Sequence, residues 1–366
     1  MKLECVKEKL SNYVSLADKI TSKNTTLPIL GFILLSAHNN VLKIRSTNLD
    51  VGVEFKIPAK IEKEGIIAVP GSVLNNTLSC LPEGKKIFLN FKNDNLEIST
   101  ENNIIVIKSQ NAEDFPTLPN IQKKETIFIS AQKLIKGIKS VCYSSSFSDI
   151  KPEISSVFIY PEKETLIFTA TDSFRLAEKK IIYNKIKNNF SGVIIPFKNI
   201  SDILRVFDGI EGEIEIVFND NQISFYYNEI YLTSRIINGV FPDYKQIIPK
   251  DRTTEIILLK QDFIDSLKLI NIFSDKFNKV TLSLNTQKNI FKINSKNDFG
   301  ENTTIIKSSV SGDDIDLSFN YKYIMDCFQS IDNDSLSLEF YGENKPMVIK
   351  GIGDNSFFYL IMPINK

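Results

Sequence analysis

Side chains that commonly perform catalysis are scarce in this sequence of 366 residues. His38 is the only histidine, and its surroundings, Ser36 to Asn40, are typical of an exposed turn. The sequence therefore lacks the histidines that a catalytic triad or a histidine-based metal site needs. The four cysteines, at positions 5, 80, 142 and 327, form no CxxC pair, which disfavours a zinc ribbon, a redox motif and a disulfide framework. We expect free thiols in a reducing compartment.

One acidic cluster has the chemistry of a cation site. Asp313, Asp314 and Asp316 carry the carboxylate oxygens that Mg²⁺ prefers, as a nuclease or a transferase would require, but an exposed acidic turn before a strand explains them more simply. The sequence has no G-x-x-x-x-G-K-[ST] phosphate loop, and residues 351–353, Gly-Ile-Gly, lack the strand and helix context of a dinucleotide fingerprint. We therefore predict a protein that is not an enzyme and uses no metal or cofactor.

The composition is that of an ordinary globular protein. Hydrophobic residues make up 42% and charged residues 24%, with 15 Gly and 13 Pro, which excludes collagen-like, disordered and disulfide-scaffold classes. No apolar stretch follows Lys2 and Glu4, so no signal peptide is expected. The most apolar segment, residues 27–37, is too short to span a bilayer. We expect a cytoplasmic protein of two to three domains, without a membrane partner.

An internal repeat organises the chain. A helical stretch opens at Pro70 and is followed by alternating strands up to Pro116, and a second stretch runs in the same way from Pro196 to Pro242. In both copies the two prolines are 46 positions apart. Self-similarity of this kind indicates that one structural unit has been copied along the chain.

The preceding half of the unit repeats as well. Residues 42–48 match residues 166–172 at an offset of 124, and residues 291–297 form a weaker third copy. Three copies nearly fill the chain and place joints near Lys123 and Pro249. We therefore predict three like domains. Their bounds are 1–122 for the N-terminal domain, 123–249 for the central domain and 250–366 for the C-terminal domain.

Each repeat predicts an α+β domain. Residues 131–146 place five apolar side chains on one stripe of a helix, whereas residues 213–216 and 334–340 alternate apolar with polar residues, as half-buried antiparallel strands do. We predict helices packed on one face of antiparallel sheets. The six predicted helices span residues 6–23, 71–81, 131–146, 197–207, 260–279 and 320–331.

The six predicted helices carry an excess of positive charge. They hold 14 basic and 7 acidic residues, which leaves 30 basic and 37 acidic residues in a chain that has 44 of each. Solvation of helix faces is enough to explain any single helix. Six helices that share one side would, however, present a positive surface suited to duplex phosphates rather than to a base sequence.

Four blocks of sequence stand out within the repeats. They are Thr26-Leu27-Pro28-Ile29-Leu30, Ala170-Thr171-Asp172-Ser173-Phe174-Arg175-Leu176-Ala177, Phe241-Pro242-Asp243-Tyr244 and Tyr359-Leu360-Ile361-Met362-Pro363-Ile364. In these blocks, in their order and in its threefold repeat, the whole chain resembles the bacterial DNA sliding clamps, the beta subunits of DNA polymerase III.

The resemblance implies a three-domain DNA clamp fold. Antiparallel sheets would form the outside and helices would line the central channel of a ring-shaped homodimer, joined head to tail. Such a ring is a processivity factor that encircles double-stranded DNA without sequence specificity, because topology and screened phosphate contacts hold the duplex. It would tether the replicative DNA polymerase, the clamp loader, other DNA polymerases and repair proteins through a peptide-binding cleft between the central and C-terminal domains.

The resemblance also assigns residues to three surfaces. The cleft would suit an apolar anchor side chain flanked by polar groups. Its predicted residues are Thr171, Ser173, Phe174, Arg175, Leu176, Pro242, Gln246, Ile247, Leu360, Ile361, Met362, Pro363 and Ile364, with Lys151, Ile154 and Pro346 from weaker matches. The predicted DNA-channel residues are Lys23, Lys133, Lys136, Lys139, Lys198 and Arg205, with the loop 21–26 as a further candidate. The predicted dimer interface contains Ile272 and Phe273.

The chain departs from the family pattern at three places. Residues 151–154, Lys-Pro-Glu-Ile, are a loose version of a family segment, Phe174 replaces a residue that is often a polar histidine, and Asn365 occupies a frequently basic position. We therefore expect a peptide preference that differs in detail. Two other classes remain open: the magnesium-dependent enzyme, and a repeat scaffold that binds proteins or saccharides but no nucleic acid.

Overall fold

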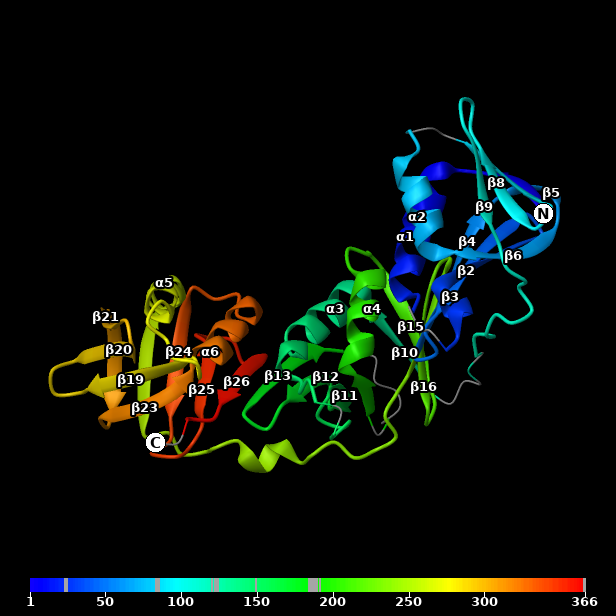
Figure 1. Ribbon diagram of the computed structural model, residues 1–366. Helices are drawn as coiled ribbons and strands as arrows, with labels where there is room; N and C mark the ends of the chain where they lie inside the picture. Colours follow the sequence, from blue (N-terminus) through cyan, green and yellow to red (C-terminus); the bar gives the residue numbers. More distant parts are fainter. Residues whose placement is uncertain are drawn as a thin grey trace. The chain divides into compact units, whose positions relative to one another are not determined.

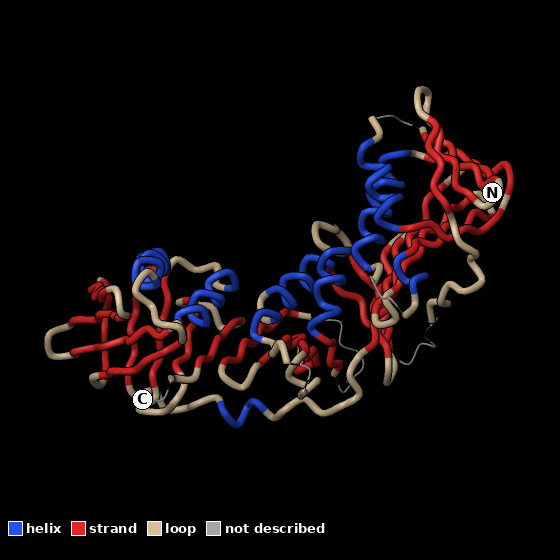
Figure 2. Tube along the Cα trace, in the orientation of Figure 1, coloured by secondary structure: helices blue, strands red, loops and turns tan. Residues whose placement is uncertain are grey.

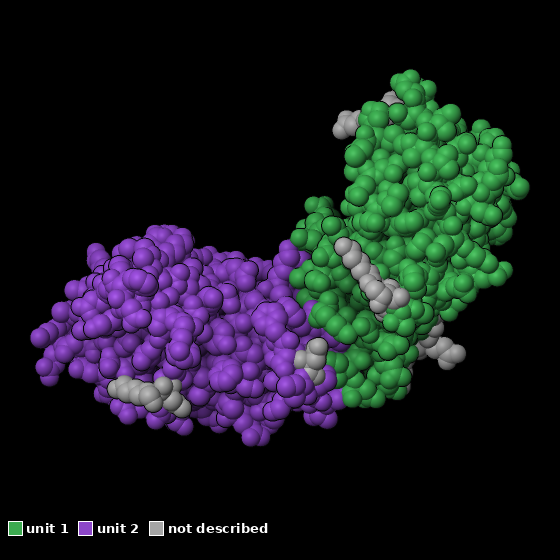
Figure 3. All heavy atoms as spheres, viewed as in Figure 1, with its two compact units in different colours: residues 1–132, 198–238 green, residues 133–197, 239–366 purple. Residues whose placement is uncertain are grey.

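The computed structural model describes residues 1–364 except 23–25, 83–85, 120, 122–124, 149, 184–189 and 191. The chain forms two compact units (Figure 3). The first unit comprises residues 1–132 and 198–238, and the second comprises residues 133–197 and 239–366. Among the described residues, no helix has the length and apolar character needed to cross a membrane.

Six α-helices are present in the described part of the chain (Figure 1). They are α1 (Lys7–Ile20), α2 (Gly71–Cys80), α3 (Ala131–Lys139), α4 (Phe197–Phe207), α5 (Lys260–Asn271) and α6 (Tyr321–Cys327). Short 3₁₀ helices are η1 (Pro28–Gly31), η2 (Cys142–Ser144), η3 (Tyr244–Ile247) and η4 (Phe328–Ser330). All six predicted helices therefore exist, and the bounds predicted for α4 are those observed.

The helices predicted over 131–146 and 260–279 end seven and eight residues early, and side chains bond to the backbone in the segments that follow them. The range 131–146 is helical only to Lys139, and the serine-rich segment that follows forms η2 instead, with Ser145 Oγ donating to the carbonyl of Ser156 at 3.0 Å. The range 260–279 is helical only to Asn271. Beyond it, the Asp275 carboxylate accepts hydrogen bonds from two backbone N–H groups, which starts a turn.

The first unit contains two antiparallel sheets. The eight strands of the larger sheet are β2 (Phe32–His38), β3 (Val41–Thr47), β4 (Val51–Pro58), β6 (Gly65–Pro70), β10 (Glu125–Ser130), β15 (Glu213–Phe218), β16 (Gln222–Tyr227) and β17 (Ile230–Arg235), in the order β10-β15-β16-β17-β4-β3-β2-β6. The five strands of the smaller sheet are β1 (Lys2–Cys5), β5 (Lys60–Lys63), β7 (Ile87–Lys92), β8 (Asn95–Ser99) and β9 (Ile104–Lys108), in the order β5-β1-β7-β8-β9.

The second unit repeats this plan. The nine strands of its larger sheet are β11 (Ser156–Glu162), β12 (Thr165–Thr171), β13 (Arg175–Ile182), β14 (Val193–Pro196), β18 (Thr254–Leu259), β22 (Ser308–Gly312), β24 (Ser335–Phe340), β25 (Met347–Gly351) and β26 (Phe357–Ile361), in the order β14-β11-β12-β13-β26-β25-β24-β18-β22. The four strands of its smaller sheet are β19 (Lys279–Asn285), β20 (Ile290–Asn297), β21 (Gly300–Ile306) and β23 (Ile315–Asn320), in the order β21-β20-β19-β23.

Each larger sheet joins strands of two sequence repeats. In the first unit β17 pairs with β4, and Leu232 lies opposite Val53. In the second unit β26 pairs with β13, and Tyr359 lies opposite Ala177. Leu232 and Tyr359 are 127 residues apart, and Val53 and Ala177 are 124 apart, the offset of the sequence repeat. The two joints therefore have the same register.

Helices pack on the sheets through apolar side chains. Helix α1 buries Leu10, Val14 and Ala17 against β3 and β4, and α5 buries Phe263 and Leu267 against β20 and β21. Burial of one such large apolar side chain contributes about 1.5–3 kcal/mol. In Figure 2, α5 and α6 lie on one face of the strands of the second unit, as predicted for an α+β fold.

The middle repeat supplies strands to both units, so the compact units do not coincide with the three repeats. The domain bounds 1–122, 123–249 and 250–366 therefore stay a prediction. With the observed helix bounds, the six helices carry 11 basic and 6 acidic residues. The positive excess is smaller than predicted, and α3 with its three lysines provides most of it.

Candidate functional site

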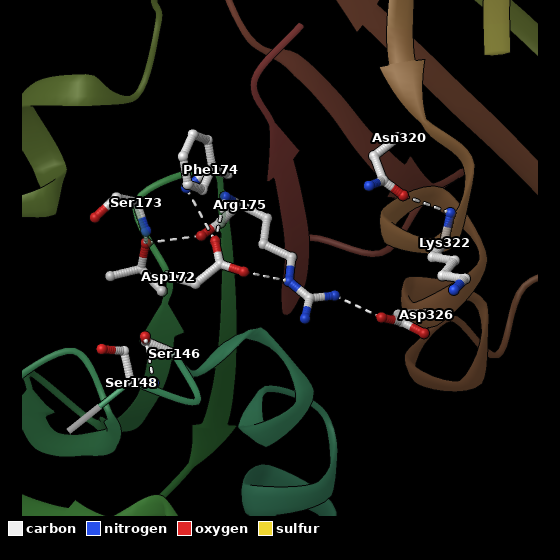
Figure 4. A network of polar contacts seen from close by, with 10 residues as sticks. Ser146, Ser148, Asp172, Ser173, Phe174, Arg175, Asn320, Lys322 and Asp326 are labelled. Carbon is white, nitrogen blue, oxygen red and sulfur yellow. Dashed lines mark hydrogen bonds and ion pairs between the residues drawn. The ribbon is translucent and has the colours of Figure 1, made fainter. Parts of the chain in front are cut away.

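A tight turn between β12 and β13 carries predicted cleft residues and is held by polar contacts (Figure 4). The Asp172 carboxylate accepts hydrogen bonds from the backbone N–H groups of Phe174 and Arg175, both at 2.9 Å, and Thr171 Oγ1 donates to the carbonyl of Arg175 at 2.7 Å. Ser173 has a φ of +78°, which an Asx turn accommodates. The turn leaves Phe174 62% exposed.

The C-terminal strand lies beside this turn. Leu360 and Ile361 of β26 pair with the first residues of β13, and the N–H of Met362 donates to the carbonyl of Phe174 at 2.8 Å. Ile361 also pairs with Met347 of β25, which directly follows the buried Pro346. The structure therefore brings together the predicted cleft residues of the turn, the tail and the segment before β25.

Arg175 is held beneath the turn by groups that the sequence did not identify. Its side chain is only 4% exposed, and its guanidinium donates to Asp172 at 2.9 Å and to Asp326 of α6 at 2.5 Å. It also lies over the ring of Tyr323, 4.3 Å from the centroid. Burial alone would lower the pKa of Arg175, but Tyr359 and Asp326 outweigh burial and raise it. The cation is therefore permanent.

Helix α6 supplies two of these groups. Its N-terminus is capped by Asn320, whose side-chain oxygen accepts from the N–H of Lys322 at 2.9 Å, and this cap fixes where the helix begins (Figure 4). Tyr323 and Asp326 lie three residues apart in this helix, so one face presents both to Arg175. The three-residue spacing was visible in the sequence, but their common partner was not.

Two further groups of predicted cleft residues lie on other segments of the second unit. Pro242, Gln246 and Ile247 are exposed in the segment that contains η3. Exposed Lys151 and half-buried Ile154 lie in a loop closed by a hydrogen bond from the N–H of Ser146 to the carbonyl of Ile154, at 2.9 Å. The same loop exposes the apolar side chains of residues 147 and 150, Phe and Ile, which the sequence analysis did not select.

The predicted DNA-channel residues lie on α3 and α4, except Lys23, which is outside the described residues. Lys136 forms an ion pair with Asp332 at 2.7 Å, and Lys198 forms one with Asp50 at 2.7 Å. Lys133 Nζ donates a hydrogen bond to the carbonyl of Ile182 at 3.1 Å, and Arg205 forms an ion pair with Asp202 at 2.8 Å. Lys139 is the last residue of α3. Exposed ion pairs are worth at most about 1 kcal/mol, so phosphates can replace these partners.

The predicted interface residues lie just after α5. Ile272 is 66% exposed, and the Phe273 ring packs on Gly300 at the start of β21, where a Cβ would lie 3.0 Å from the ring. Other large apolar side chains are exposed in this part of the second unit. They are Phe277, Phe299 and Ile305.

The acidic cluster forms hydrogen bonds with neighbouring side chains. Asp314 accepts from the N–H and the hydroxyl of Thr286, which lowers the pKa of Asp314, and Asp316 accepts from the hydroxyl of Ser283 at 2.6 Å. His38 ends β2 and lies 2.7 Å from Glu64. In the described parts of the chain, no three His, Cys, Asp or Glu side chains converge in a way that could hold a metal ion.

Comparisons with known proteins identify all three repeats. Family models of the N-terminal, central and C-terminal domains of the DNA polymerase III beta subunit match residues 1–119, 128–243 and 245–365. A beta sliding clamp of Synechocystis is 27% identical, with 100% of this chain and 99% of the relative covered. A beta sliding clamp of Staphylococcus aureus is 27% identical, with 94% of each covered.

Solved structures agree with these matches. The DNA polymerase sliding clamp of Bacillus subtilis superposes with a TM-score of 0.95 at 25% identity, covering 100% of this chain and 99% of that chain. A sliding clamp of Pseudomonas aeruginosa bound to griselimycin superposes with a TM-score of 0.94 at 22% identity, with both chains fully covered. The three consecutive domain matches extend almost from end to end, and the chain therefore belongs to the bacterial DNA polymerase III beta subunit family, the beta sliding clamps.

Proposed function

We propose that this chain is the processivity factor of a replicative DNA polymerase and is not an enzyme. It acts in the cytoplasm as a homodimeric ring around double-stranded DNA, which it binds without sequence specificity. It tethers the polymerase, the clamp loader and repair proteins through the cleft between its central and C-terminal domains. The observation that carries this proposal is that consecutive repeats are joined by the same strand pairing, β17 with β4 and β26 with β13. The two strands equivalent to these that form no such pairing within the described part of the chain can pair between two chains.

The two joints within the chain predict a third joint between chains. Each uses the last strand of one repeat, β17 or β26, and the fourth strand of the repeat before it, β4 or β13. The strands in the same positions that remain are β9 in the first repeat and β21 in the third. Strand β9 ends the five-stranded sheet and β21 ends the four-stranded sheet. Two chains joined head to tail would pair these edges twice and close a ring.

The register of this third joint follows from the first two. In each repeat, paired residues can be followed from the strand that precedes the first helix, strand by strand, to the last strand. Residues at the same distance from the start of that helix then lead to Val106 of β9, Thr233 of β17 and Leu360 of β26, which are therefore equivalent. Thr233 lies opposite Gly52 and Leu360 lies opposite Leu176. Residues 47, 171 and 296 hold the same place in the three sequence repeats, and they pair with residues 52, 176 and 301. Glu301 of β21 is therefore equivalent to Gly52 and Leu176. Val106 of one chain therefore faces Glu301 of the other.

Apolar side chains at both edges support this joint. Ile104 and Val106 are exposed on β9, and Ile305 is exposed on β21, whose first residue, Gly300, packs against Phe273. Exposed apolar side chains on an unpaired strand edge favour association. The predicted dimer residues Ile272 and Phe273 thus belong to the same surface as the strand that the register argument selects.

Cysteine pairs test the register. The variant Val106→Cys/Glu301→Cys, in a chain where exposed Cys80 is replaced by Ser, is expected to form a disulfide-linked dimer under mild oxidation. Directly opposed residues have Cα atoms about 4.5–5.5 Å apart, within the range that a disulfide spans. Non-reducing gel electrophoresis measures the yield.

A shifted pair is the matched control. Thr303 lies two residues from Glu301 on the same face of β21 and is also exposed, so Val106→Cys/Thr303→Cys changes only the register. Efficient cross-linking of this control with none of the first pair would show that the joint has another register. If neither pair forms a cross-link, β9 and β21 are not part of the interface.

Retention on DNA tests the function itself. The protein, loaded onto nicked circular DNA by a clamp loader and ATP, is expected to stay bound during gel filtration and to be lost after a restriction enzyme linearises the circle. An encircling ring leaves only by opening or over an end, whereas screened phosphate contacts allow sliding. A scaffold that binds no nucleic acid would show no dependence on DNA ends, and a nuclease would degrade the circle.

The cleft is proposed as the partner site because it combines apolar and fixed polar groups. Leu176, Leu360 and Ile361 are buried behind it, Phe174 is exposed, and Arg175 holds the turn in place. Sliding clamps of Pseudomonas aeruginosa and Bartonella birtlesii have been solved bound to griselimycin. We propose that griselimycin and partner peptides occupy this cleft in the present chain.

A further inference from the structure

The segment that contains η3, residues 241–247, has both buried and exposed side chains. Phe241 and Tyr244 are buried, whereas Pro242, Gln246 and Ile247 are exposed. The exposed residues are the ones that the resemblance assigns to the cleft. The buried ones have no assigned role, so their contacts show what holds the exposed ones in place.

The Tyr244 hydroxyl is the polar anchor of this segment. It donates a hydrogen bond to the carboxylate of Glu178 on β13 and shares a hydrogen bond of 2.7 Å with the hydroxyl of Tyr160 on β11. Glu178 is itself buried, so its carboxylate depends on such donors. Burial and the Glu178 charge raise the pKa of Tyr244, which keeps its hydroxyl protonated as a donor.

Aromatic and ionic contacts complete the attachment. The Phe241 ring stacks on Phe158 with centroids 4.9 Å apart, and Phe158 in turn stacks on Tyr160 at 4.9 Å. Lys245 forms an ion pair with Glu162. Residues 241, 244 and 245 are therefore fixed on β11, which ends at Glu162, and on β13, and the intervening Pro242 is exposed.

We propose that Tyr244, through Glu178, is a positioning residue of the cleft. Glu178 lies three residues after Arg175 on the same strand, so β13 carries both the turn and the point to which the η3 segment is attached. The hydroxyl of Tyr244 fixes the distance between Ile247 on one side and Phe174 on the other, without touching a ligand. This inference rests on the proposed function of the cleft.

Tyr244→Phe removes only the hydroxyl. It is expected to weaken binding of fluorescein-labelled griselimycin, or of a labelled peptide copied from a replicative polymerase, about tenfold, because the η3 segment loses its hydrogen bond to the charged Glu178. Fluorescence anisotropy measures the dissociation constant. Hydrogen exchange of the amides of residues 241–247 should become faster in the variant, while that of β26 should not change.

Tyr341→Phe is the matched control. Tyr341 also donates its hydroxyl to a glutamate of the second unit, Glu339, at 2.7 Å, but it follows β24 and carries none of the predicted cleft residues. This variant is expected to lose a hydrogen bond of the same kind with unchanged ligand affinity. A double-mutant cycle of Tyr244→Phe and Glu178→Gln should show strong coupling in affinity, because the two residues share one bond.

The outcomes separate this inference from the proposed function. If the unaltered protein binds neither probe, the proposed cleft function fails. If it binds a probe and Tyr244→Phe binds equally well, or if both tyrosine variants lose the same affinity, the positioning role is overturned.

Discussion

Ile272→Asp is expected to convert the protein from a dimer to a monomer and to abolish its retention on circular DNA. Ile272 is 66% exposed in the single chain, so a charge there leaves the monomer folded. In the proposed joint the side chain is buried beside β21 and β9, and burying an unpaired carboxylate is strongly unfavourable. Analytical ultracentrifugation at micromolar concentration measures the oligomeric state.

The effect is large because a head-to-tail dimer contains the joint twice. Loss of about 1.5–3 kcal/mol of isoleucine burial at each joint already weakens the dimer roughly a hundredfold to ten-thousandfold, before the cost of the buried charge is added. Ile66→Asp is the matched control, since Ile66 is 54% exposed on β6 and has no part in the proposed joint. A stable dimer of Ile272→Asp would place the interface elsewhere.

Removal of residues 362–366 is expected to abolish stimulation of the polymerase while the dimer stays intact. The truncation deletes Met362, whose N–H bonds to the carbonyl of Phe174, and Ile364, whose N–H bonds to Ser318. Strand β26 keeps its pairing with β13, because it ends at Ile361. Residues that anchor a peptide interface often contribute about 2 kcal/mol or more each, so affinity for a partner peptide should fall at least about a hundredfold.

Two measurements separate loss of the cleft from loss of the ring. Primer extension with polymerase and loader reports stimulation, and native mass spectrometry reports the dimer. Normal stimulation of the polymerase by the truncated chain would show that the tail is not part of the partner-binding site. A monomeric truncated chain would mean that the tail supports the joint and not the cleft.

Local patterns predicted the elements well where nothing else competed with them. Residues 197–207 form the predicted helix, because it begins at a residue after proline and ends where its apolar stripe ends at Phe207. The tail lies beside the turn at Phe174, since β26 pairs with β13 and Met362 bonds to Phe174, but the role of these residues as a cleft stays a prediction. The predictions for 131–146 and 260–279 are wrong at their C-terminal ends, where serine and aspartate side chains bond to the backbone in place of further helical turns.

Features that depend on distant partners could not be read from the sequence. Tyr323 and Asp326 became part of the site only when α6 was placed beside the buried Arg175. The acidic partners of Lys136 and Lys198 come from residues 332 and 50, which are far away in the chain. Acidic side chains therefore offset part of the positive charge that a count of helix residues indicates, although phosphates can replace these exposed partners.

The proposed joint between β9 and β21 would also allow unwanted assembly in the cell. A joint between unlike surfaces does not limit itself to two copies, since every added chain offers the same free edge again. Only curvature stops the growth: when the angles at successive joints add up to one full turn, the last edge meets the first. Substitutions that change the bend within a chain, far from either edge, would therefore open circles into filaments with every contact surface still intact.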